Sequence, residues 1–119
     1  MTVSVERGQQ RLVPLGAVGE LGRSKRSVVV VDGQELLVLC VRRRFTVLEN
    51  RCPHLGLPLD DARVVGGTLV CAGHGYKYGL ADGTRVAGWR CPSGGSERLA
   101  LVPTRVEDGV LYALVGTPA

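Results

Sequence analysis

The sequence is poor in residues that several common functions require. Its 119 residues include two histidines, one methionine and two lysines, and aromatic residues make up only 4%. So few aromatic side chains cannot form a stacking platform for bases, and nucleic-acid binding is not expected despite a net charge of +4. The single methionine, Met1, leaves a blue-copper site without an axial ligand from the chain.

Long apolar segments and dense cysteines are also missing. The longest aliphatic run, residues 36–41, is far too short to cross a bilayer. Residues 1–7 lack the apolar core of a signal peptide. Four cysteines are too few for a disulfide scaffold. These absences predict a soluble cytoplasmic protein without membrane contact, in which metal binding is the expected use of cysteine.

The chain is rich instead in glycine and in short valine and leucine runs. It contains 17 glycines, and Asp-Gly pairs separate apolar runs, which is typical of hairpins. No segment carries a helical period over three turns. The sequence therefore predicts an all-β sandwich or small barrel in one domain. The expected strands are residues 11–15, 27–31, 35–42, 45–48, 64–65, 68–70, 77–80, 99–106 and 110–115, and the expected loops include 16–25 and 87–97.

Both histidines and two of the four cysteines lie in one stretch. One residue separates Cys52 from His54, two residues separate Cys71 from His74, and sixteen residues separate the two pairs. Each pair falls in a predicted loop between strands, where a rigid β scaffold can hold two loops face to face. This pattern predicts a metal site with two thiolate and two imidazole ligands.

Two kinds of metal centre suit this ligand set. Structural zinc takes two cysteines and two histidines, but zinc modules usually place like ligands on the same turn. Here each loop carries one of each kind. A [2Fe–2S] cluster with two cysteines on one iron and two histidines on the other also fits. A catalytic mononuclear iron would need further histidines, so we expect no catalytic residues.

The pattern resembles the Rieske iron–sulfur proteins, whose motif is Cys-x-His, a spacer of similar length, and Cys-x-x-His. Residues 52–59 and 74–83 are similar to the two cluster loops of that family, and Pro92 is placed like its third, proline-bearing loop. The resemblance covers roughly residues 10–115. It implies a Rieske-type antiparallel β-sandwich over residues 1–119, with a small cluster-binding subdomain at about 46–95.

The resemblance also implies a role for each ligand. Cys52 and Cys71 would hold the inner iron of one [2Fe–2S] cluster, and His54 and His74 would hold the outer, solvent-facing iron. Two neutral imidazoles in place of two thiolates make the oxidised cluster less negative, which raises its reduction potential above that of plant-type ferredoxins.

Other positions refine this expectation. High-potential Rieske proteins carry an extra cysteine in each cluster loop, where this chain has Leu57 and Gly73. The chain is therefore similar to low-potential soluble Rieske ferredoxins. Of the remaining cysteines, Cys40 is expected to be a small buried hydrophobe in a strand, and Cys91 a free thiol near the cluster.

The implied function is a monomeric electron carrier. It would pass single electrons from a ferredoxin reductase to a terminal oxygenase through transient contacts, as a component of an oxygenase system and not itself an enzyme. Two alternatives stay open: a Rieske-like small subunit of an assimilatory nitrite reductase, and a zinc-stabilised binding module. The sequence identifies neither the oxygenase nor its substrate.

Basic residues gather close to the ligand stretch in the sequence. Four arginines precede the first ligand loop, and two further basic residues are expected at the same end of the molecule. They predict either a solvated edge or a docking rim for an acidic partner. These residues are Arg42, Arg43, Arg44, Arg51, Lys77 and Arg90.

Overall fold

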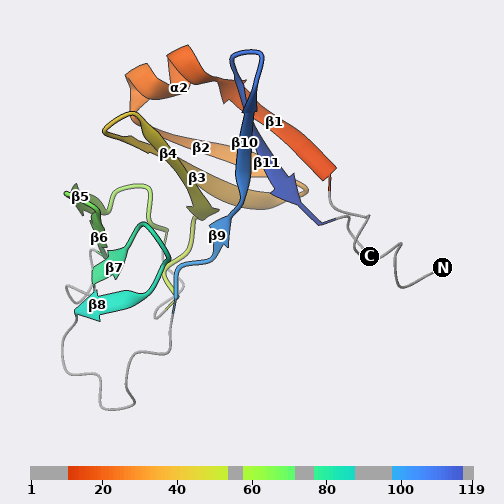
Figure 1. The fold of residues 1–119 in the computed structure, drawn as a ribbon. Helices are drawn as coiled ribbons and strands as arrows, with labels where there is room; N and C mark the ends of the chain where they lie inside the picture. Colours follow the sequence, from red (N-terminus) through yellow and green to blue (C-terminus); the bar gives the residue numbers. More distant parts are fainter. Residues whose placement is uncertain (1–10, 54–57, 72–76, 88–97, 117–119) are drawn as a thin grey trace.

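The computed structural model describes residues 11–53, 58–71, 77–87 and 98–116. Within these residues the chain forms eleven strands and one short helix (Figure 1). In chain order they are β1 (Arg11–Ala17), α2 (Val18–Ser24), β2 (Arg26–Val31), β3 (Gln34–Val41), β4 (Arg44–Glu49), β5 (Arg63–Val65), β6 (Thr68–Val70), β7 (Lys77–Gly79), β8 (Arg85–Ala87), β9 (Leu101–Val102), β10 (Thr104–Glu107) and β11 (Val110–Val115).

The strands pair antiparallel in three sheets. Their orders are β1-β11-β10, β2-β3-β4-β9 and β5-β6-β7-β8. The first two sheets lie against each other as a sandwich, and the small third sheet packs below them in the view of Figure 1. The expected all-β antiparallel sandwich with a small subdomain is confirmed.

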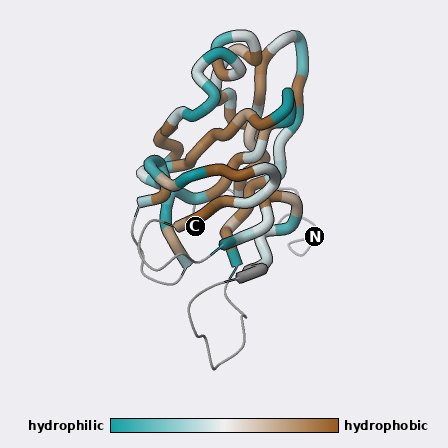
Figure 2. The backbone as a smooth tube through the Cα atoms, turned by 90° about the vertical axis from the view of Figure 1, so that its left-hand side faces the viewer, coloured by the Kyte–Doolittle hydropathy of each residue, from teal (hydrophilic) through white to brown (hydrophobic). Residues whose placement is uncertain are grey.

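Strands β3 and β4 of the central sheet have a hydrophobic core on both faces. Successive side chains of a strand point to opposite faces, and β3 shows this clearly. Leu36 and Val38 belong to the core shared with β11 and α2, whereas Leu37 and Leu39 belong to the core shared with the third sheet. This is why residues 36–41 are continuously apolar rather than alternating. Full burial of each leucine contributes about 2 kcal/mol, and Figure 2 shows the hydrophobic colour concentrated on the inner strands.

Two-residue turns set the register of the hairpins. Val31 pairs with Gln34, and Glu107 pairs with Val110. The Asp-Gly pairs between them have positive φ at both residues, 53° and 78° in the first turn and 52° and 77° in the second. Turns of this kind match the twist of the flanking strands, so the predicted Asp-Gly hairpins are confirmed.

The prediction that residues 16–25 form a loop is wrong, because residues 18–24 form helix α2. The helix has two glycines and only seven residues, so it has a low intrinsic propensity and is too short to show a period. It is held by packing, since Leu21 is buried in the core beside β11. The helix ends at Lys25, which adopts φ 64° and donates its N–H to the Leu21 carbonyl at 3.0 Å.

The predicted single strand 99–106 is also wrong, because it divides at Pro103. Leu101 and Val102 pair with β4 in the central sheet, whereas residues 104–107 pair with β11 in the first sheet. Proline has no N–H to donate to a ladder, so it marks the point where the chain changes sheets. The predicted loop 87–97 lies outside the described residues, except for Ala87 at the end of β8.

Candidate metal centre

Cys52 and Cys71 come together in the interior although nineteen positions separate them. Cys52 follows the end of β4, and Cys71 directly follows β6. Their sulfur atoms are 3.1 Å apart, and the two residues are only 1% and 3% exposed. A disulfide would require about 2.05 Å, so the two sulfur atoms meet as thiols.

This pair of sulfur atoms fits a metal centre. Both can bind one metal ion, because metal–thiolate bonds are about 2.3 Å long. The surroundings are apolar, since both cysteines belong to the core cluster that contains Leu48, Leu69 and Tyr78. A thiolate in such surroundings needs a compensating positive charge, and a bound metal ion supplies one.

The third sheet fixes the position of Cys71. Leu69 pairs with Tyr78, and Val70 pairs with Lys77, so residues 71–76 form the connection of the β6–β7 hairpin. Leu69 and Tyr78 are fully buried. The second ligand loop therefore starts and ends on two strands that are anchored in the core.

Asn50 holds together the two ends of the first ligand loop, a role that was not predicted from the sequence. Its side chain is 7% exposed and accepts a 2.7 Å hydrogen bond from the Leu59 N–H. Its Nδ2 donates to Glu35 Oε1 at 3.0 Å and to Asp60 Oδ1 at 3.1 Å. Residues 50 and 59 are thus joined across the base of the loop that carries Cys52. The available signal was an asparagine two positions before the first ligand, a residue that often bonds to nearby backbone.

The other predicted ligands lie outside the described residues. His54 and His74 fall in the ranges 54–57 and 72–76, so their role stays a prediction. The same holds for the predictions made on Leu57, Gly73, Arg90, Cys91 and Pro92, which also lie outside the described residues.

Cys40 is separated from the two converging cysteines by the central sheet. Cys40 lies two residues after Val38 and four after Leu36 on β3, so it shares the face of the strand that points to the core beside α2. A Cβ added at Gly22 of α2 would lie 3.9 Å from the Cys40 sulfur. Cys52 and Cys71 lie in the other core. Cys40 lies in a strand as expected, but it is only partly buried instead of fully buried, and it is not placed to join the metal site.

The predicted grouping of the arginines with the ligand loop is wrong for Arg42, Arg43 and Arg44. These residues lie at the β3–β4 turn, whereas Cys52 follows the opposite end of β4. A six-residue strand separates them by roughly 17 Å. Arg51 and Lys77 are exposed and adjacent in sequence to the two ligand loops. Neighbours in sequence therefore fall at different ends of the molecule.

A match to a protein-family model extends from residue 11 to residue 103, and its description is the Rieske [2Fe–2S] domain. The chain belongs to this family. Membership implies one Rieske-type [2Fe–2S] cluster, and the paired thiols of Cys52 and Cys71 fit two of its ligands.

Two curated relatives are much longer than this chain. The 4beta-methylsterol monooxygenase of Methylococcus capsulatus is 32% identical over 76 residues, which cover 60% of this chain and 21% of that protein. The oxidoreductase NdmD of Pseudomonas putida is 36% identical over 73 residues, which cover 59% of this chain and 12% of that protein. The chain thus spans about a fifth or less of the curated relatives it matches.

Solved structures share the fold. One is an oxygenase and ferredoxin complex of carbazole 1,9a-dioxygenase, with a TM-score of 0.79, 21% identity, and coverage of 92% of this chain and 29% of that chain. Another is the terminal oxygenase of carbazole 1,9a-dioxygenase from Nocardioides aromaticivorans, with a TM-score of 0.78, 24% identity, and coverage of 92% of this chain and 31% of that chain.

The part of the chain that the structure describes contains no helix with the length and hydrophobicity needed to span a membrane.

Proposed function

We propose that Cys52, His54, Cys71 and His74 hold the [2Fe–2S] cluster of a single Rieske domain. The observation that carries this proposal is the convergence of the buried Cys52 and Cys71 sulfur atoms from two different loops. The two histidines share those loops and complete the ligand set of the family. In this proposal the domain spans residues 1–119, and its cluster-binding part spans about 46–95.

The proposed function is a one-electron carrier that links a ferredoxin reductase to a terminal oxygenase. When bound, a Rieske cluster accepts and donates one electron at a time. The chain contributes an apolar core around Cys52 and Cys71 and the paired strands β6 and β7 on either side of the second ligand loop. Proteins of this kind dock through small, transient interfaces. The oxygenase systems among the relatives and the structural neighbours support this assignment.

A ligand test uses the purified protein after reduction. His54→Ala and His74→Cys should each abolish the Rieske-type EPR signal, because an imidazole ligand is lost. Cys40→Ser is the matched control and should keep the signal, since Cys40 faces the other core. An unchanged spectrum in either histidine variant would show that the ligands are misassigned. One zinc per chain without acid-labile sulfide would refute the cluster itself.

A separate test addresses the redox partners. The reduced protein should be reoxidised rapidly by a terminal oxygenase, and the oxidised protein should be reduced by an NAD(P)H-dependent reductase, both in stopped-flow mixing. A protein that keeps its cluster but exchanges electrons with neither partner would refute the carrier role and leave the ligand assignment intact.

A second candidate is an electron-entry domain within a larger oxygenase assembly. It is favoured by the structural neighbours, whose matched chains are about three times as long as this one. Gel filtration distinguishes the two candidates. A monomer that transfers electrons alone supports the carrier, whereas permanent association with a large subunit supports the assembly.

A further inference from the structure

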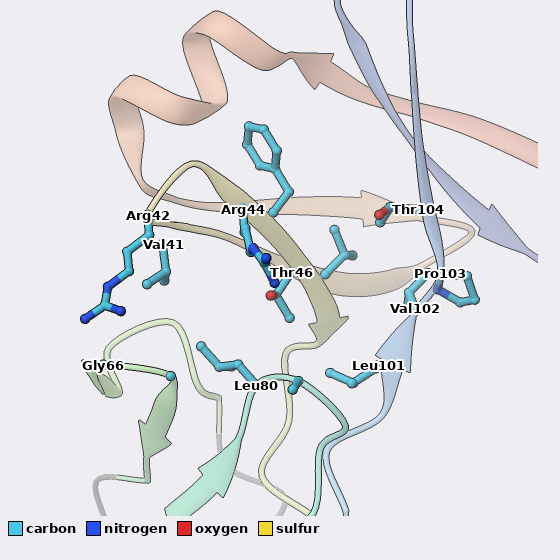
Figure 3. Close-up of a pocket in the computed structure, with 14 residues that line it drawn as sticks. Val41, Arg42, Arg44, Thr46, Gly66, Leu80, Leu101, Val102, Pro103 and Thr104 are labelled. Carbon is cyan, nitrogen blue, oxygen red and sulfur yellow. The ribbon is translucent and has the colours of Figure 1, made fainter.

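A groove of about 780 Å³ lies between the central sheet and the third sheet (Figure 3). Its walls come from β4, β9 and Pro103 on one side, and from the Gly66-Gly67 turn and Leu80 on the other. Leu80 and Leu101 provide apolar surface, while Arg42 and Arg44 stand at one end. Among the described residues, those that line the groove do not include Cys52 or Cys71, so the groove does not coincide with the described part of the proposed metal centre.

One wall of the groove is an open strand edge. β9 pairs only with Val47 and Leu48 of β4, because the chain leaves this sheet at Pro103. The Glu49 N–H donates to the Ala100 carbonyl on this edge. In a strand, the N–H and C=O groups of every second residue point to the same edge. The N–H and C=O of Phe45 therefore point to the same edge of β4 as those of Glu49, at a position that β9 does not reach. An extended chain can pair with such an edge.

The end of the groove carries positive charge, and no described carboxylate forms an ion pair with it. Arg42, Arg43 and Arg44 are all exposed. The ion pairs formed among the described residues are Arg11–Asp32, Arg51–Glu49 and Arg105–Glu107, so none of them neutralises this turn. The groove thus combines apolar walls, an open backbone edge and unneutralised guanidinium groups.

The Arg42-Arg43 turn is itself a conformational exception. Both arginines adopt the left-handed region, with φ 52° and 67°. The other two-residue turns of the described chain have Asp-Gly or Gly-Gly at these positions. Side chains other than glycine, asparagine and aspartate are disfavoured there. The arginine pair is therefore kept at a cost to stability, and unfavourable backbone of this kind collects at functional positions.

We infer that this groove binds an extended acidic segment of a partner protein, which adds a strand to the open edge of β4. Its backbone would pair with Phe45, its apolar side chains would lie between Leu80 and Leu101, and its carboxylates would meet Arg42 and Arg44. This surface lies about one strand length from Cys52, at the other end of β4. The inference does not depend on the electron-carrier role, because binding is measured without electron transfer.

The test uses the whole protein and a fluorescein-labelled peptide with alternating aspartate and valine residues. Saturable binding is expected by fluorescence anisotropy. Arg42→Gln combined with Arg44→Gln should weaken binding about tenfold, because two charge contacts are lost. Arg63→Gln is the control, since Arg63 is exposed on β5 outside the groove, and it should leave the affinity within twofold.

Two further measurements separate strand addition from general anion binding. A peptide N-methylated at alternate residues should bind at least tenfold more weakly, because it cannot complete the ladder. The double variant Arg42→Asn with Arg43→Gly should raise the melting temperature by a few degrees and weaken binding, because it relaxes the turn and removes two positive charges, one of them at the groove. No saturable binding would overturn the inference. Equal binding of the methylated peptide, or displacement by octanoate, would overturn strand addition in favour of a small amphipathic anion.

Discussion

Replacing Asn50 by alanine tests whether one buried side chain holds the first ligand loop. The Asn50 side chain makes three hydrogen bonds, to the Leu59 N–H, Glu35 and Asp60. The two carboxylate residues are exposed and can turn to water, so losing these bonds costs little. The Leu59 N–H is buried and would lose its acceptor, which costs about 1–3 kcal/mol. We expect a total loss of about 2–3 kcal/mol.

For a chain of this length, that loss corresponds to a fall in melting temperature of about 10 °C. The loss should also be felt at the metal centre, because the bond between residues 50 and 59 closes the loop that carries Cys52. Iron release to a chelator should therefore be several times faster in Asn50→Ala than in the parent protein. Calorimetry measures the first effect, and chelator absorbance measures the second.

The neighbouring substitution Arg51→Gln is the control. Arg51 forms a 3.4 Å ion pair with Glu49 on the surface, and such pairs contribute less than about 1 kcal/mol. If Asn50→Ala released iron no faster than Arg51→Gln, the loop would not depend on Asn50. If stability fell and iron release stayed unchanged, Asn50 would support the fold alone.

Two further predictions concern the turn between β7 and β8, which contains Asp82 and Gly83. Gly83→Ala should destabilise the fold by about 2–4 kcal/mol in denaturant titrations, because φ is 79° and a Cβ would lie 2.8 Å from the Leu99 carbonyl oxygen. Gly33→Ala, with φ 78° and open space, should cost only about 1 kcal/mol; equal losses would exclude the clash. The Thr84 N–H and hydroxyl donate to the Asp82 carboxylate and hold its pKa below the ordinary value for aspartate. This gives a stabilisation that is present above the ordinary pKa and is lost as the pH falls through the lowered pKa. Asp82→Asn should flatten this part of the stability–pH curve, and an unchanged curve would contradict the assignment.

Local signals predicted the hairpins well because their cause is local. An Asp-Gly pair can adopt positive φ at low cost, and the turn then fixes the pairing of Val31 with Gln34. Helix α2 could not be predicted in this way. Its seven residues include two glycines, and it is stable because Leu21 packs into a core built from distant strands. Tertiary packing overrides propensity there.

In the candidate site, too, one feature could be predicted from local sequence, whereas others depended on the fold. The spacing of Cys52 and Cys71 predicted two loops that meet, and the two sulfur atoms do meet. The positions of Asn50 and of the arginine turn did not follow from sequence distance. Arg44 and Cys52 are close in sequence, yet β4 carries them to opposite ends. A strand turns a few residues into a long separation, so proximity in sequence is a poor guide wherever an extended element intervenes.

Strand β4 therefore links the candidate metal centre with the proposed docking groove. Its C-terminal end leads into the ligand loop through Asn50, and its N-terminal half forms the open edge of the groove. Between them Val47 and Leu48 are fully buried in the two cores on either side of the sheet. A strand packed on both faces cannot shift along its axis without disrupting both cores. A partner segment in the proposed groove should consequently leave Cys52 in place, so the proposed docking and the proposed electron exchange would use different parts of the surface.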